Sequence, residues 1–151
     1  MFSILEITKR LMSALIFGGV IGIERERRGR AAGLRTHILV SLGSALIMLV
    51  SIYMFEIYGE KGAVDPSRIA AGVITGIGFL GAGTIIRSGD GIIGLTTAAT
   101  IWVSAGIGLA CGCGFIEGAF LATILCLIVL CVLRKLEGVL KKEDKQEVKY
   151  G

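Results

Sequence analysis

The stretch between Arg68 and Arg87 contains no charged residue for 18 positions. An α-helix of that length rises about 27 Å, close to the thickness of the hydrocarbon core of a bilayer. Asp65 and Pro66 precede the stretch and form a typical helix start, because the aspartate can accept a bond from a first-turn N–H and proline lacks that donor. The sequence therefore predicts a membrane-spanning helix over residues 66–86.

Small residues occupy one side of this predicted helix. At about 100° per residue, an arc of roughly 160° collects Ala71, Gly72, Thr75, Gly76, Gly78, Ala82 and Gly83. Helices in lipid gain little from hydrophobicity and associate through close backbone approach over such residues. We therefore expect this face to pack against protein, with the packing residues Gly72, Gly76, Gly78 and Gly83.

The rest of the chain is similarly apolar. Its hydrophobic fraction of 54% and mean hydropathy of +0.80 exclude a soluble globular domain and indicate a polytopic membrane protein. Other apolar runs predict a first helix that starts near Ile4 and spans over residues 36–55, 92–110 and 115–133. We expect an all-α transmembrane bundle of about five helices in one domain, residues 1–133, followed by a charged tail, residues 134–151.

The basic residues indicate an orientation in the membrane. Of the 16 Lys and Arg, 12 fall in the polar connection 24–35, at the glycine-rich turn 87–91 and in the tail. Five spans place these three segments on one side, which the positive-inside rule assigns to the cytoplasm. We expect an external N-terminus and a cytoplasmic C-terminus, and this topology explains the net charge of +4 without a nucleic-acid partner.

Hydroxyl side chains form a stripe in the span 92–110. Thr97, Thr100, Ser104 and Gly108 lie on one side at helical spacing. Hydroxyls in lipid bond to carbonyls of the preceding turn or reach a neighbouring helix. Two interpretations remain open, a structural stripe that faces protein and a path for a solute.

The acidic residues bear on cation binding. Mg²⁺ is typically held by one or two carboxylates and retained waters. The candidates are Glu24 and Glu26 on the cytoplasmic side, with Asp65 and Glu60 opposite. No span contains an acid at its centre, so a solvated or arginine-paired role also fits them. The single histidine, His37, begins a span and is interpreted as an interfacial hydrogen bonder.

Other motifs predict no chemistry. The G-x-G-x-x-G pattern over residues 76–81 lies inside an apolar helix, whereas a dinucleotide site needs a strand-to-helix turn. The four cysteines, Cys111, Cys113, Cys126 and Cys131, have no disulfide or zinc spacing. No nucleophile accompanies a histidine and an acid, so we expect neither an enzyme nor a cofactor beyond a Mg²⁺ ion.

Five blocks occur in order along the chain: GIERE at 22–26, GLRTH at 33–37, DPSRIAA at 65–71, GIGFLGAG at 76–83 and GLTTAATIW at 94–102. Together they resemble the MgtC/SapB family of bacterial inner-membrane proteins, over about residues 10–133. The resemblance implies a helical membrane domain linked to magnesium homeostasis and, in part of the family, regulation of other membrane machines during infection. The matching positions imply functional roles for Glu24, Arg25, Arg35, Asp65, Arg68, Thr96 and Thr97. Longer members add a soluble C-terminal domain, so the short SapB-like branch is the closer comparison.

Two functions follow as hypotheses. The first is a non-enzymatic membrane module whose small-residue faces bind its own copies or a membrane partner. The second is a transporter or channel for Mg²⁺ or another small solute, lined by Thr97, Thr100, Ser104 and the central glycines.

Overall fold

A computed structural model describes residues 2–59, 65–89 and 91–133 of the chain. In this part the fold is all-α as predicted, with five helices and one small β-hairpin. The predicted tail 134–151 and the metal candidate Glu60 lie outside the described residues.

The first two helices are longer than predicted. Helix α1 spans Ile4–Arg27, and its N-cap Ser3 accepts a hydrogen bond from the Glu6 N–H. Helix α2 spans Leu34–Tyr58. The predicted polar connection over residues 24–35 is therefore too long at both ends. Glu24 to Arg27 form the last turn of α1, and α2 already begins at Leu34. Polarity does not end this helix, because its last-turn arginines favourably meet the negative end of the helix dipole.

Helix α3, Pro66–Ala82, starts where it was predicted and ends four residues early. The Asp65 carboxylate caps it, accepting the Ser67 N–H at 2.9 Å. Its C-cap is Gly83, and the β-branched residues that follow enter a hairpin of β1, Ile86–Ser88, and β2, Gly91–Ile93. The antiparallel register pairs Ile86 with Ile93. The predicted tight turn is thus the tip of this hairpin, whose strands are exposed.

Helix α4 spans Leu95–Cys113, and α5 spans Ile116–Ile128 before it continues as a π-helical turn, Val129–Leu133. Gly94 and Gly114 flank α4 in the left-handed conformation, each with a φ of 93°. A side chain at Gly94 would also collide with the carbonyl of Thr84, so a glycine is required where the hairpin joins the helix.

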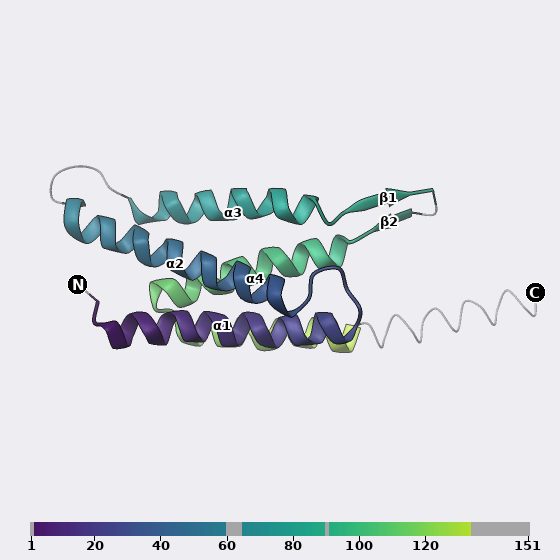
Figure 1. Cartoon of the computed structure of the whole chain (residues 1–151), viewed down its shortest axis with the longest axis horizontal. Helices are drawn as coiled ribbons and strands as arrows, with labels where there is room; N and C mark the ends of the chain where they lie inside the picture. The colour runs from purple at the N-terminus through teal and green to yellow at the C-terminus, as the bar shows by residue number, and fades with distance from the viewer. Residues whose placement is uncertain (1, 60–64, 90, 134–151) are drawn as a thin grey trace, which may run out of the picture.

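Helix α4 lies at the centre of the bundle and contacts α1, α2, α3 and α5. Helices α2 and α4 run parallel to each other and antiparallel to α1 and α3, with α3 at one edge (Figure 1). The small-residue run that appeared dominant in the sequence is therefore a peripheral helix. The main apolar core comprises Ala14, Ile21, Ala45, Ile107, Cys111, Ala119 and Leu130.

Glycines bring α1, α2 and α4 close together. A Cβ added at Gly18 would lie 2.8 Å from the Ser41 Cβ, and one at Gly22 would lie 2.7 Å from the Leu34 Cα. On α4, a Cβ added at Gly108 would lie 2.8 Å from the Ser44 Cβ, and one added at Gly112 would lie 2.7 Å from the Met48 Cβ. Both distances are shorter than real Cβ contacts, so only glycine fits at these two positions. Close backbone approach over small residues thus holds the centre of the bundle.

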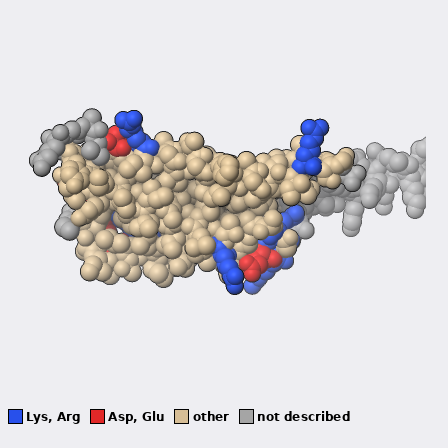
Figure 2. All heavy atoms as spheres, turned by 45° about the horizontal axis from the view of Figure 1, so that its top comes forward, with Lys and Arg blue, Asp and Glu red and all other residues tan. Residues whose placement is uncertain are grey.

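On the face drawn in Figure 2, Lys, Arg, Asp and Glu gather in a few places, and the broad surface between them carries no charged side chain. Helices α2, α4 and the stretch Ile116–Leu133 are long and apolar enough to cross a membrane, and α3 is a shorter apolar helix. This distribution identifies the chain as a membrane protein.

Candidate functional site

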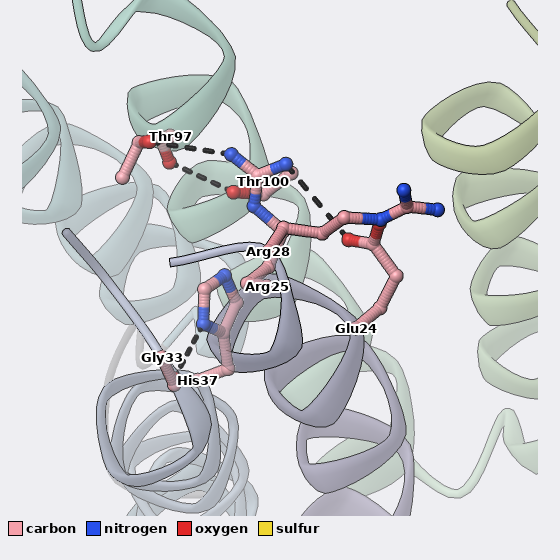
Figure 3. Close-up of polar contacts among 7 residues, drawn as sticks. All are labelled: Glu24, Arg25, Arg28, Gly33, His37, Thr97 and Thr100. Atoms are coloured by element: carbon pink, nitrogen blue, oxygen red, sulfur yellow. Dashed lines mark hydrogen bonds and ion pairs between the residues drawn. The ribbon is translucent and has the colours of Figure 1, made fainter. Parts of the chain in front are cut away.

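A buried arginine joins α1 to the start of α4. The side chain of Arg25 is 4% exposed, and its Nη2 donates to the Thr97 hydroxyl at 3.3 Å. The Thr100 hydroxyl in turn donates to the Thr97 carbonyl at 2.9 Å. Figure 3 shows these three side chains converging between the two helices. Arg25 and Thr97, which the family resemblance implied as functional residues, therefore form one contact.

One carboxylate balances this cation. Glu24 lies 3.8 Å from Arg25 and accepts a hydrogen bond from Arg28 Nε at 3.0 Å (Figure 3). Its side chain is only 11% exposed. A buried ion is stable only when it is paired, so Glu24 serves the arginines here rather than a solvated metal ion.

His37 lies beside this pair and is fully buried. Its Nδ1 lies 2.9 Å from the Gly33 carbonyl and donates to it, because a carbonyl only accepts (Figure 3). The predicted role of His37 as a hydrogen bonder is met by this bond, and its backbone packs closely against Gly18 of α1.

The polar contacts continue toward the middle of the bundle. On α4, Gly108 lies against Ser41 and Ser44 of α2. One turn further along both helices, Gly112 lies against Ala45 and Met48, so α4 and α2 run parallel in register. One turn before Gly108, Ser104 therefore lies at the level of His37. The hydroxyls of Ser41 and Ser104 and the His37 Nε2 are buried without a hydrogen-bond partner among the described residues. Thr97, Thr100 and Ser104 thus form a protein-facing stripe, as one of the two interpretations predicted.

A second buried arginine, Arg10, lies at the opposite end of α1. Its Nη1 donates to the Gly112 carbonyl at 2.8 Å, and its guanidinium pairs with Glu6 and covers the Phe2 ring. Sequence reasoning missed this residue. The spacing contained the clue, because Arg10 lies four residues before Ala14 on the stripe that continues through Gly18 and Gly22.

The remaining candidates do not join this cluster. Thr96 and Arg35 are exposed, and Glu26 accepts the Leu34 N–H at 2.7 Å, which caps α2. Asp65 and Arg68 lie at the start of α3, at the other end of the bundle from the end of α1 (Figure 1). The metal candidates Glu24, Glu26 and Asp65 therefore do not meet within the chain.

The predicted packing face of α3 is open within the chain. A Cβ at Gly72, Gly76 or Gly78 would meet nothing within 4 Å, and Gly83 is the C-cap of the helix. Its packing against protein stays a prediction, since no second chain is present.

The side chains of this polar cluster decide whether it could bind a metal ion or let one pass. Among residues 2–59, 65–89 and 91–133, no group of three His, Cys, Asp or Glu side chains is placed to hold a metal ion. The buried hydrogen bond from Arg25 to Thr97 links α1 to α4, and Arg25 places a positive charge beside the hydroxyl stripe. This charge opposes passage of a divalent cation along that stripe.

Comparison with known proteins agrees with the membrane architecture. The model of the MgtC family matches residues 11–139. The chain belongs to the MgtC family. Members that resemble it include the "Putative magnesium transporter YhiD" of Escherichia coli strain K12, which is 50% identical over 84% of this chain and 60% of its own length.

Two further relatives carry the name MgtC. The protein of Brucella abortus strain 2308 is 44% identical over 87% of this chain and 52% of its own length. That of Salmonella typhimurium strain 14028s is 46% identical over 83% of this chain and 51% of its own length. The chain thus spans between half and three-fifths of the MgtC-family relatives it matches. No solved structure matches it.

Proposed function

We propose that this chain is a non-enzymatic protein of the bacterial inner membrane that acts in Mg²⁺ homeostasis through helix–helix association. The name of one relative, the "Putative magnesium transporter YhiD" of Escherichia coli, supports the link to magnesium. The association partner is a second copy of the chain or another membrane protein, and the contact is made by the small-residue face of α3.

The open face of α3 carries this proposal. Gly18, Gly22, Gly108 and Gly112 are all covered by neighbouring backbone, whereas Gly72 and Gly76 meet nothing. These two glycines line a groove of about 640 Å³ between α2 and α3, together with apolar residues that include Val40, Ile47, Val73 and Ile77. Small residues that are open to lipid allow another helix to approach closely.

The test is a Gly76→Leu variant of the full chain in lipid nanodiscs. We expect a lower assembly state or loss of a cross-linked partner, together with impaired growth at low Mg²⁺ in complemented cells. Gly106→Leu is the matched control, because Gly106 on α4 also meets nothing within 4 Å but lies outside this groove. Unchanged assembly and growth in Gly76→Leu would contradict the proposal.

Transport of Mg²⁺ is the second candidate function. The name of the Escherichia coli relative favours it, whereas the positive charge of Arg25 beside Thr97 counts against the hydroxyl stripe as the path of the ion. Flux of Mg²⁺ into proteoliposomes that is lost in Asp65→Asn would support transport. Absence of flux for every divalent ion would reject it.

The orientation belongs to the same proposal. We place the basic end of the bundle and the C-terminus in the cytoplasm, since 12 of the 16 Lys and Arg belong to that side. Reporter fusions after residue 30 and at the C-terminus should both report a cytoplasmic location, and an external reporter at either site would overturn the orientation.

A further inference from the structure

A groove of about 570 Å³ runs between the end of α1 and the π-helical turn that follows α5. Its walls are Val20, Ile23, Glu24, Arg27, Arg28 and Cys131. It is separate from the groove beside α3 and belongs to the basic end of the bundle.

The groove changes character along α1. Val20, Ile23 and Arg27 succeed one another at helical spacing, so they lie on one side of the helix and span about 10 Å along its axis. Val20 and Ile23 are apolar and about 40% exposed, at 39% and 41%. An apolar wall therefore leads directly to a cationic rim.

The arginines at the rim are not fully paired with the carboxylates around them. Glu24 is engaged by Arg25 and by the Nε of Arg28, and Glu26 is engaged by the α2 N-terminus. The terminal Nη groups of Arg28 point away from Glu24 (Figure 3). Arg27 makes no ion pair with any residue that the structure describes and is exposed. Two guanidinium groups are thus available to an external anion.

The position fits a molecule that is apolar at one end and anionic at the other. In this groove the arginines Arg27 and Arg28 adjoin the apolar residues Val20 and Ile23, and basic residues at the end of an apolar helix lie at the level of lipid headgroups. A soluble phosphate would not use the apolar wall, and a zwitterionic headgroup would bring an ammonium group to the arginines.

We propose that this groove binds an anionic phospholipid. One acyl chain lies along Val20, Ile23 and Cys131, and the phosphate accepts hydrogen bonds from Arg27 and Arg28. Arginine favours this role because its planar guanidinium group bonds a phosphate through two N–H groups at once.

The test compares binding of phosphatidylglycerol and phosphatidylcholine with identical acyl chains to the full chain, by native mass spectrometry. We expect the unmodified protein to prefer phosphatidylglycerol. Arg27→Gln should weaken that preference about fivefold, and Arg27→Gln/Arg28→Gln by on the order of tenfold or more. Arg27 is exposed and makes no hydrogen bond or ion pair with any residue that the structure describes, so we expect its variant to keep the fold.

Arg30→Gln is the matched control, because it removes the same charge from the same end of the bundle outside the groove. An equal loss in Arg27→Gln and Arg30→Gln would overturn the proposal in favour of general attraction, as would no preference in the unmodified protein. Displacement of the lipid by millimolar inorganic phosphate would also overturn it, since that result describes a free anion site. Cys131→Phe, which fills the apolar wall, should reduce retention of the lipid.

Discussion

Arg10 and Gly112 make a buried contact 2.8 Å long between the guanidinium Nη1 and the carbonyl oxygen. Fifteen residues further along α1, Arg25 makes the corresponding contact to Thr97 near the start of α4. Because the two helices run antiparallel, α1 holds both ends of α4 through arginine side chains. Helix α4 contacts all four other helices, so these anchors fix the centre of the bundle.

Loss of the Arg10 anchor should destabilise the fold. Arg10→Met keeps the aliphatic length and leaves the Gly112 carbonyl and Glu6 without their cation. A buried hydrogen bond to a charged group contributes about 1.5–3 kcal/mol, and we expect a loss of that size in reversible unfolding in mixed micelles. Lys9→Met, at the exposed neighbouring position, should change stability by less than about 0.5 kcal/mol. Equal effects of the two variants would show that Arg10 is no anchor.

The opposite anchor gives a second comparison. Thr97→Val keeps the side-chain shape and removes the hydroxyl that accepts from Arg25. We expect about 1.5–3 kcal/mol of destabilisation, because the buried guanidinium loses a partner. Thr96→Val, one residue earlier and exposed, should be nearly neutral. The same unfolding measurement compares the two variants. If Thr97→Val did not change stability, the 3.3 Å contact between Arg25 and Thr97 would contribute nothing to it.

Glycines on two sides of α4 should respond with opposite signs. Gly108→Ala places a Cβ 2.8 Å from that of Ser44 and should cost about 1–3 kcal/mol through overpacking. Gly106→Ala meets nothing within 4 Å and should stabilise the helix by about 0.5–1 kcal/mol. Thermal unfolding of both variants tests this, and the same sign for both would contradict the packing described for Gly108.

The start of α3 should depend on pH. Hydrogen bonds from the Ser67 side chain and N–H, with a smaller contribution from Arg68, lower the pKa of Asp65 below its ordinary value of 3.8. A lowered folded-state pKa means that the capping carboxylate stabilises α3 fully above about pH 4 and loses this effect as pH falls through the folded value. The protection of the Ser67 amide hydrogen against exchange, corrected for the intrinsic rate at each pH, should decrease below about pH 4.

Asp65→Asn supplies the control for that experiment. Asparagine also caps helices but does not titrate in this range. In this variant, the exchange of the Ser67 amide hydrogen, corrected for intrinsic rates, should therefore vary little between pH 3 and pH 5. A variant that showed the same pH dependence as the unmodified chain would assign the effect to another group.

Much of the local structure follows from short-range physics. Asp65 and Pro66 specify the start of α3, and the hydroxyl stripe of α4 was correctly placed on one side of a helix. Helix ends were harder, because the charged last turn of α1 resembles a loop in polarity. The contact of Arg25 with α4 and the pairing of Glu24 with two arginines hold one side of that turn against the bundle.

The site was only partly predictable. Arg25 and Thr97 were both candidates, but 72 residues separate them and nothing local joins them. Ser41 and Arg10 were missed, and the burial of His37 was not predicted, because inward orientation depends on which helix covers a residue. A small-residue stripe on α1 contained a usable clue, since Arg10 and Gly18 share it.

The sequence alone determined that the chain is a helical membrane protein, because apolar length, glycine spacing and the placement of basic residues act locally along it. The tertiary structure decided which helix is central. Small residues permit close approach on α1, α3 and α4 alike, yet α4 also receives the guanidinium groups of Arg10 and Arg25 at its two ends. Both guanidinium groups find acceptors on α4, whereas α3 lies at the edge of the bundle with Gly72 and Gly76 open.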